Sequence, residues 1–205
     1  MDVKKGKMLF LLLAFGAFHL TGCTAHVSPH VSEAEFMFPG PKVPGRSTLY
    51  VSEEFRTYMR TKTDVMDLKK WEFELGPVAV DAFKYALAGR FKDAEVRLGT
   101  PGFPLEGEDN QDVLVVVQPA FENFKAHAPF FFKFETYKVT VSFRVKVFDK
   151  AGNVLVDDVY EGVGKKRGSI GYESAGHAAA PVAAQMAVEE AVNKAVADIV
   201  RTVNR

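Results

Sequence analysis

The sequence predicts an α+β fold: a mostly antiparallel sheet of about 5–6 strands with two helices packed on one face. Residues 136–148 alternate apolar and polar side chains, which is typical of a strand with one wet face. Residues 154–163 supply a return strand, so a hairpin is expected. Apolar residues recur at helical spacing in two other segments, one before and one after this hairpin.

The first half of the domain carries short elements. Residues 48–52 and residues 71–75 are predicted as strands. Gly76 and Pro77 open a helix, because proline suits the first helical turn. The apolar stripe of this helix comprises Val80, Phe83, Leu87 and Phe91.

The strands that follow differ in how polar they are. Residues 94–98 alternate and predict a strand that leaves the helix. After a loop over residues 99–110, residues 112–118 contain an unbroken Val and Leu run, which favours a central strand. Residues 149–153 form the hairpin turn after the alternating strand, with a glycine available for positive φ.

A long final helix is predicted over residues 179–203. The glycine-rich stretch 162–176 leads to it, and the small residues at 169–171 and 174–176 suit a flexible connection before a helix. Pro181 is tolerated because it falls in the first turn. The buried stripe of this helix comprises Val188, Val192, Ala195, Ile199 and Val203.

Composition excludes several classes of protein. The chain has 205 residues, of which 47% are apolar, so it is neither disordered, collagenous nor a multi-span membrane protein. Lys+Arg and Asp+Glu both number 26, and this balance gives no reason to expect nucleic acid as a partner. The single cysteine excludes a disulfide framework and a Cys-rich zinc site.

The N-terminal residues have the pattern of an export signal. A lysine-rich start precedes an apolar run over residues 8–18, which is too short to span a bilayer. Leu20, Thr21, Gly22 and Cys23 follow it and resemble the lipobox of bacterial lipoproteins. The resemblance implies cleavage between Gly22 and Cys23, with diacylglycerol on the thiol and an acyl chain on the new amino group. The alternative is a plain signal peptide or amino-terminal anchor with an incidental cysteine.

The predicted organisation has three parts. Residues 1–22 are the signal peptide, residues 23–46 a flexible tether rich in Pro and Gly, and residues 47–205 the periplasmic α+β domain. More than one acyl chain makes the anchor stable in a membrane. Thr24 occupies the position where the inner-membrane retention signal of enterobacterial lipoproteins usually has Asp. The outer membrane, facing the periplasm, is therefore the expected location.

No catalytic constellation stands out, and we expect no enzyme, no metal and no cofactor beyond the covalent lipid. The only thiol is used by the anchor, and no G-x-S-x-G elbow occurs. A serine near His177 is an alternative nucleophile pair, although small residues there also suit a connection before a helix. Asp157 and Asp158 are adjacent in a strand and therefore point to opposite faces.

Two clusters are candidates for binding. Lys165, Lys166 and Arg167 form a basic cluster that either contacts an anion, such as a lipid phosphate, or keeps a strand edge in solution by charge. A phenylalanine-rich segment either caps the core under a long connection or forms an exposed patch for a partner protein or acyl chain. This second cluster comprises Phe121, Phe124, Phe130, Phe131 and Phe132.

The layout of the mature chain is similar to that of YajG-type envelope lipoproteins and, more loosely, transport-auxiliary lipoproteins. The matching features are the lipobox, a helix followed by a strand, the alternating strand near residue 140, its glycine-containing return strand and an Ala-rich helix over 183–200. The resemblance implies a non-enzymatic lipoprotein that serves as an accessory or docking subunit for a periplasmic or outer-membrane partner in transport or assembly. The alternative hypothesis is a lipid-binding protein with a pocket between sheet and helices.

Overall fold

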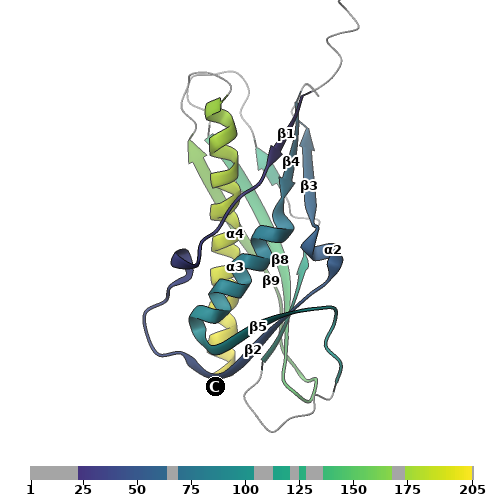
Figure 1. Ribbon diagram of the computed structural model, residues 1–205, viewed down its shortest axis with the longest axis vertical. Helices are drawn as coiled ribbons and strands as arrows, with labels where there is room; N and C mark the ends of the chain where they lie inside the picture. The colour runs from purple at the N-terminus through teal and green to yellow at the C-terminus, as the bar shows by residue number, and fades with distance from the viewer. Residues whose placement is uncertain are drawn as a thin grey trace, which may run out of the picture.

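The computed structural model consists of two β-sheets packed against two long helices (Figure 1). It describes residues 23–63, 69–103, 113–120, 125–127, 136–167 and 174–204. The strands are β1 (Cys23–Val27), β2 (Val43–Val51), β3 (Met59–Thr63), β4 (Lys69–Glu74), β5 (Phe91–Leu98), β6 (Val113–Pro119), β7 (Lys125–His127), β8 (Thr136–Phe148) and β9 (Val154–Arg167). The helices are η1 (Glu33–Phe36), α2 (Glu53–Arg56), α3 (Leu75–Arg90) and α4 (Ser174–Val203).

The main sheet has six strands in the order β5-β2-β6-β8-β7, with β9 on the other side of β8. β2 runs parallel to both β5 and β6, whereas β8 is antiparallel to each of its partners. The sheet is thus mixed, although the predicted class, α+β with two main helices, is confirmed. The alternating strand has the predicted bounds, and its hairpin turn contains Gly152 at φ +90°.

The two long helices cover one face of the main sheet (Figure 1). The alternating side chains of β8 explain this arrangement, because its apolar set, including Val139, Phe143 and Val147, is buried while Lys138 and Arg144 are exposed. On α4, the predicted stripe is buried from Val188 to Ile199. Burial of these stripes is what fixes the helices to the sheet. No helix in the described part of the chain has the length and hydropathy to cross a membrane.

α4 lies in direct contact with the backbone of β9. Gly162 and Gly164 are on the strand face that meets the helix, and a Cβ at Gly164 would lie 1.7 Å from the carbonyl oxygen of Ala183. A Cβ at Gly162 would lie 1.9 Å from the carbonyl oxygen of Ala187. These two glycines of the stretch 162–176 are therefore strand residues that permit close approach. β9 extends to Arg167 and α4 begins at Ser174, so the strand ends later and the helix begins earlier than the predicted positions 163 and 179.

The prediction of a flexible tether over residues 23–46 is wrong. β1 pairs with β4 in the second sheet, whose order is β1-β4-β3, and places Ala25 opposite Trp71. Val27 and Phe36 are both 1% exposed and belong to the same core as the rest of the domain. Proline and glycine disfavour a regular element locally, but a strand more than forty residues later supplies the hydrogen-bonding partner. The folded domain thus includes residues from Cys23 onward.

Candidate functional site

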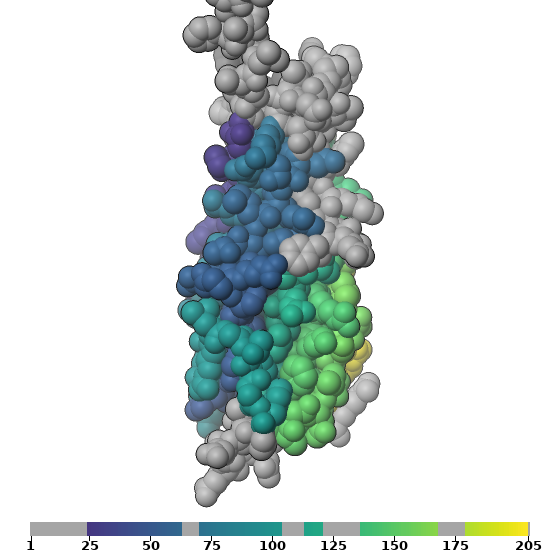
Figure 2. Space-filling view, turned by 90° about the vertical axis from the view of Figure 1, so that its right-hand side faces the viewer, coloured from purple at the N-terminus to yellow at the C-terminus, as the bar shows by residue number. Residues whose placement is uncertain are grey.

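The predicted lipidation residue, Cys23, opens strand β1 at one end of the molecule (Figure 1). Its backbone is in register with Lys69, and the next residue, Thr24, is in register with Lys70. Figure 2 shows the same arrangement from another side, with β1 and β4 next to each other near the end of the described molecule. Gly22 lies outside the described residues. Any group attached to Cys23 is therefore held at this end by the strand ladder.

The predicted basic cluster lies at the end of β9. Lys165, Lys166 and Arg167 are all exposed. Lys165 is in register with Lys138 on β8, so these two side chains point to the same face of the hairpin. Lys166 is in register with Tyr137 and points to the opposite face.

The basic cluster and Cys23 are at the same end of the fold. Tyr137 links them, because its ring meets that of Trp71 edge to face at a centroid distance of 5.9 Å. Trp71 is two residues along β4 from Lys69, which is in register with Cys23. The structure thus brings together two features that are more than 140 residues apart in the sequence.

The phenylalanine-rich candidate patch, with Phe121, Phe124, Phe130, Phe131 and Phe132, lies outside the described residues. It remains a prediction. The backbone of His177 lies in α4, within the first turns of the helix rather than in a glycine-rich connection. Within the described ranges no group of three His, Cys, Asp or Glu residues is placed to hold a metal ion.

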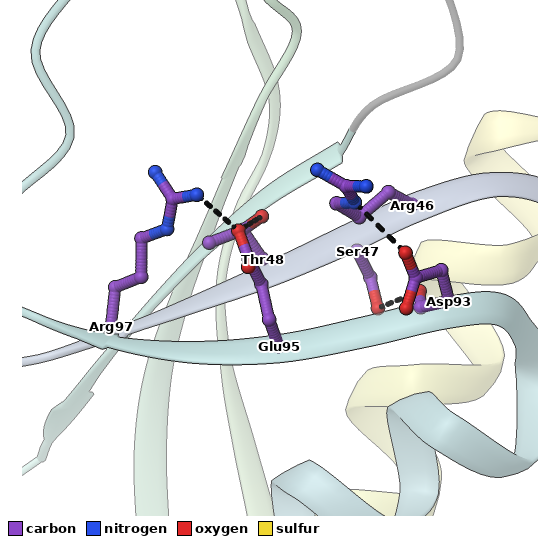
Figure 3. Close-up of polar contacts among 6 residues, drawn as sticks. All are labelled: Arg46, Ser47, Thr48, Asp93, Glu95 and Arg97. Atoms are coloured by element: carbon purple, nitrogen blue, oxygen red, sulfur yellow. Dashed lines mark hydrogen bonds and ion pairs between the residues drawn. The ribbon is translucent and has the colours of Figure 1, made fainter.

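Asp157 of β9 lies in surface ion pairs with two residues of β8. Arg144 donates to Asp157 from Nε at 2.8 Å and from Nη2 at 3.1 Å, and Lys146 Nζ lies 3.5 Å from Asp157 Oδ2. The hydrogen bonds from Arg144 hold the pKa of Asp157 below its usual value. β2 and β5 carry a similar set of contacts, in which Arg46 pairs with Asp93 at 3.0 Å (Figure 3). Each of these ion pairs joins two neighbouring strands of the main sheet.

We expect Asp157→Asn to make the free energy of unfolding depend less steeply on pH in acid solution. Because the folded-state pKa is lowered, the stabilising contribution of Asp157 is present above its unfolded pKa of 3.8 and is lost as the pH falls through the folded value. The effect is small, since the pair is exposed to solvent. Thermal melts between about pH 7 and pH 3 measure it. Asp81→Asn, on the exposed face of α3, is the control; equal slopes for the two variants contradict the expectation.

Side chains of α4 cover part of the β9 edge. The backbone N–H of Val163 donates to Glu190 Oε2 at 2.8 Å, and Lys194 Nζ donates to the Glu161 carbonyl at 2.8 Å. Lys194 and the Val163 amide lower the pKa of Glu190. A shallow groove of about 580 Å³ lies beside these contacts. Its lining includes Val163, Met186, Glu189, Glu190, Asn193 and Lys194.

Comparison with known proteins gives only distant likenesses. No protein-family model matches the chain, and no curated protein does. A solved structure from Xanthomonas campestris, described with family model DUF330, is 11% identical with a TM-score of 0.45 and covers 89% of this chain and 96% of its own. A "putative lipoprotein" from Caulobacter crescentus is 16% identical with a TM-score of 0.40, covering 63% of this chain and 83% of its own.

A hypothetical protein from Chlamydia trachomatis is 13% identical with a TM-score of 0.45, and the match covers 80% of this chain and 98% of that one. This chain is thus distantly similar to a DUF330 protein and to a protein described as a lipoprotein. At identities this low, none of the three assigns it to a family.

Proposed function

We propose that this protein is a non-enzymatic lipoprotein of the bacterial cell envelope, anchored by acyl chains on Cys23, whose folded domain docks a partner protein of the envelope. One observation carries the proposal: the lipobox cysteine is the sole cysteine of the chain, and the same residue opens the first strand of the fold. Because Cys23 lies at one end of the molecule, acyl chains attached there leave the remaining surface open to a partner.

Thr24 supports outer-membrane placement on the periplasmic side, since it differs from the Asp that usually retains such proteins in the inner membrane. An accessory role in transport or assembly agrees with the positions of the carboxylates that form ion pairs on the sheet. The carboxylates of Asp93 and Asp157 are engaged in exposed pairs on the sheet rather than gathered in a cleft. At Gly162 and Gly164 the helix and strand backbones are too close to admit an acyl chain, so a lipid pocket would have to lie away from this contact between α4 and β9.

The anchor is tested by mass spectrometry of the protein purified from bacterial membranes. We expect the N-terminal peptide to begin at Cys23 and to carry a diacylglyceryl group together with an N-linked acyl chain. A mature peptide that begins at another residue, or an unmodified Cys23, would contradict the proposal. Density-gradient separation of the two membranes tests the expected outer-membrane location in the same preparation.

The docking role is tested by crosslinking in intact cells. We expect a discrete partner to be trapped, and the trapping to be lost when Phe130, Phe131 and Phe132 are replaced by serine. Met37→Ser is the control, because Met37 is an apolar side chain that is 77% exposed. If every crosslink survives the triple replacement, the docking surface does not include this segment.

A further inference from the structure

The end of the molecule that carries Cys23 concentrates positive charge, although the chain as a whole has 26 basic and 26 acidic residues. The exposed cationic side chains come from four strands, β3, β4, β8 and β9. They are Lys62, Lys70, Lys138, Lys165, Lys166 and Arg167. A neutral chain with its cations gathered at one end presents a local field that its net charge does not reveal.

The register of the strands accounts for this gathering. Lys62 on β3 is in register with Trp71, the residue that follows Lys70 on β4. The ring of Tyr137 contacts that of Trp71, and Tyr137 is in register with Lys166 on β9. The four strands thus present their cations around the point where β1 begins. The gathering of cations from four strands does not follow from the charge pattern along the chain.

Carboxylates in the described residues offset little of this charge. Glu72 accepts a hydrogen bond from Lys70 at 2.6 Å and lies 3.2 Å from His26 Nδ1. Lys138, Lys165 and Lys166 form no ion pair with any residue in the described ranges. Their charges are therefore available to an external anion.

We propose that this cationic end binds the phosphate groups of lipid headgroups in the leaflet that holds the acyl chains. The inference rests on the proposed acylation of Cys23. Because β1 begins at Cys23 and is paired with β4 from its first residue, no tether separates the anchor from the domain. The lysines are thus held at the membrane end of the domain, and an anionic surface attracts charges over a screening length of ~8 Å at physiological salt. Each such charge strengthens attraction to an anionic surface by roughly fivefold.

Charge at a strand edge also prevents edge-to-edge pairing, and that role needs only a charge of either sign. Headgroup binding needs positive charge. The double substitution Lys165→Glu and Lys166→Glu therefore separates the two, since it keeps the edge charged and reverses its sign. Lys84→Glu with Lys92→Glu is the matched control, because both residues are exposed on α3 and β5.

The experiment uses the full chain purified with its anchor and reconstituted in two kinds of vesicle, phosphatidylcholine alone or phosphatidylcholine with phosphatidylglycerol. A water-soluble amine reagent modifies the exposed lysines, and mass spectrometry gives the rate at Lys138. We expect modification of Lys138 to be about fivefold slower on the anionic vesicles. The difference should disappear in the Lys165 and Lys166 double variant and persist in the control.

Each other outcome overturns the proposal. Equal rates on both vesicles, or equal loss in both double variants, show that the cationic end does not bind headgroups. Slower modification on phosphatidylcholine vesicles after addition of inorganic phosphate shows a site for free anion instead. Flotation of the chain with the vesicles is scored in parallel: a chain that floats without protecting Lys138 refutes only the headgroup contact. A chain that lacks acyl groups and does not float refutes the proposed function as well.

Discussion

Gly164→Ala is expected to remove much of the stability of the domain. The new Cβ would lie 1.7 Å from the carbonyl oxygen of Ala183 and 2.7 Å from the backbone nitrogen of Ala187. Both are backbone atoms of α4, so no side-chain rotation relieves the clash, and the helix must move away from β9. Overpacking of this severity costs at least about 3 kcal/mol. Natural domains have only about 5–15 kcal/mol in total.

Urea unfolding followed by circular dichroism measures this effect as a lowered midpoint and a lowered free energy of unfolding. Gly102→Ala is the matched control, because a Cβ at Gly102 meets nothing within 4 Å. We expect the control to unfold at the midpoint of the parent protein. Equal midpoints for the two variants would show that α4 does not lie as close to β9 as described.

Cys23→Ser is expected to abolish lipidation altogether. Serine has no thiol to accept the diacylglyceryl group, and cleavage before residue 23 depends on that group in lipobox-bearing proteins. The variant should therefore keep residues 1–22 and incorporate no labelled palmitate. Serine is close to cysteine in size, and β1 pairs through its backbone, so the fold should be preserved. Gel mobility, palmitate labelling and N-terminal mass spectrometry read out the three expectations.

Thr24→Ser serves as the control for this change. It alters the neighbouring exposed residue of the same strand and leaves the thiol in place. This variant should be cleaved, acylated and recovered with the envelope like the parent protein. A Cys23→Ser protein that is trimmed and membrane-bound to the same extent as this control would remove the basis of the proposed anchor.

Local pattern was sufficient for most of the regular elements. Residues 136–148 alternate without a break, and the strand has those bounds because alternation is a property of each residue and its immediate neighbours. The apolar stripes near Phe83 and Val188 likewise placed both long helices. Element ends were less accurate, since β9 and α4 both extend into the stretch whose glycines favoured a connection.

The candidate site was predictable only in parts. Cys23 is identified by the residues that precede it, and the cluster from Lys165 to Arg167 is visible as a run of charges. Nothing in either motif places the two together. Their proximity depends on the pairing of β1 with β4, on the contact between Trp71 and Tyr137, and on the register of β8 with β9.

The sequence by itself determined the α+β class, the two helices, the central hairpin and the predicted lipidation residue, because each depends on short-range periodicity or on a contiguous motif. Only the tertiary structure decided that residues 23–27 form a strand and that the lysines gather beside Cys23. It also decided that α4 approaches β9 closely at Gly162 and Gly164. These features arise from hydrogen bonds and contacts between segments far apart in the chain. Local composition carries no record of the partner that makes such a contact favourable.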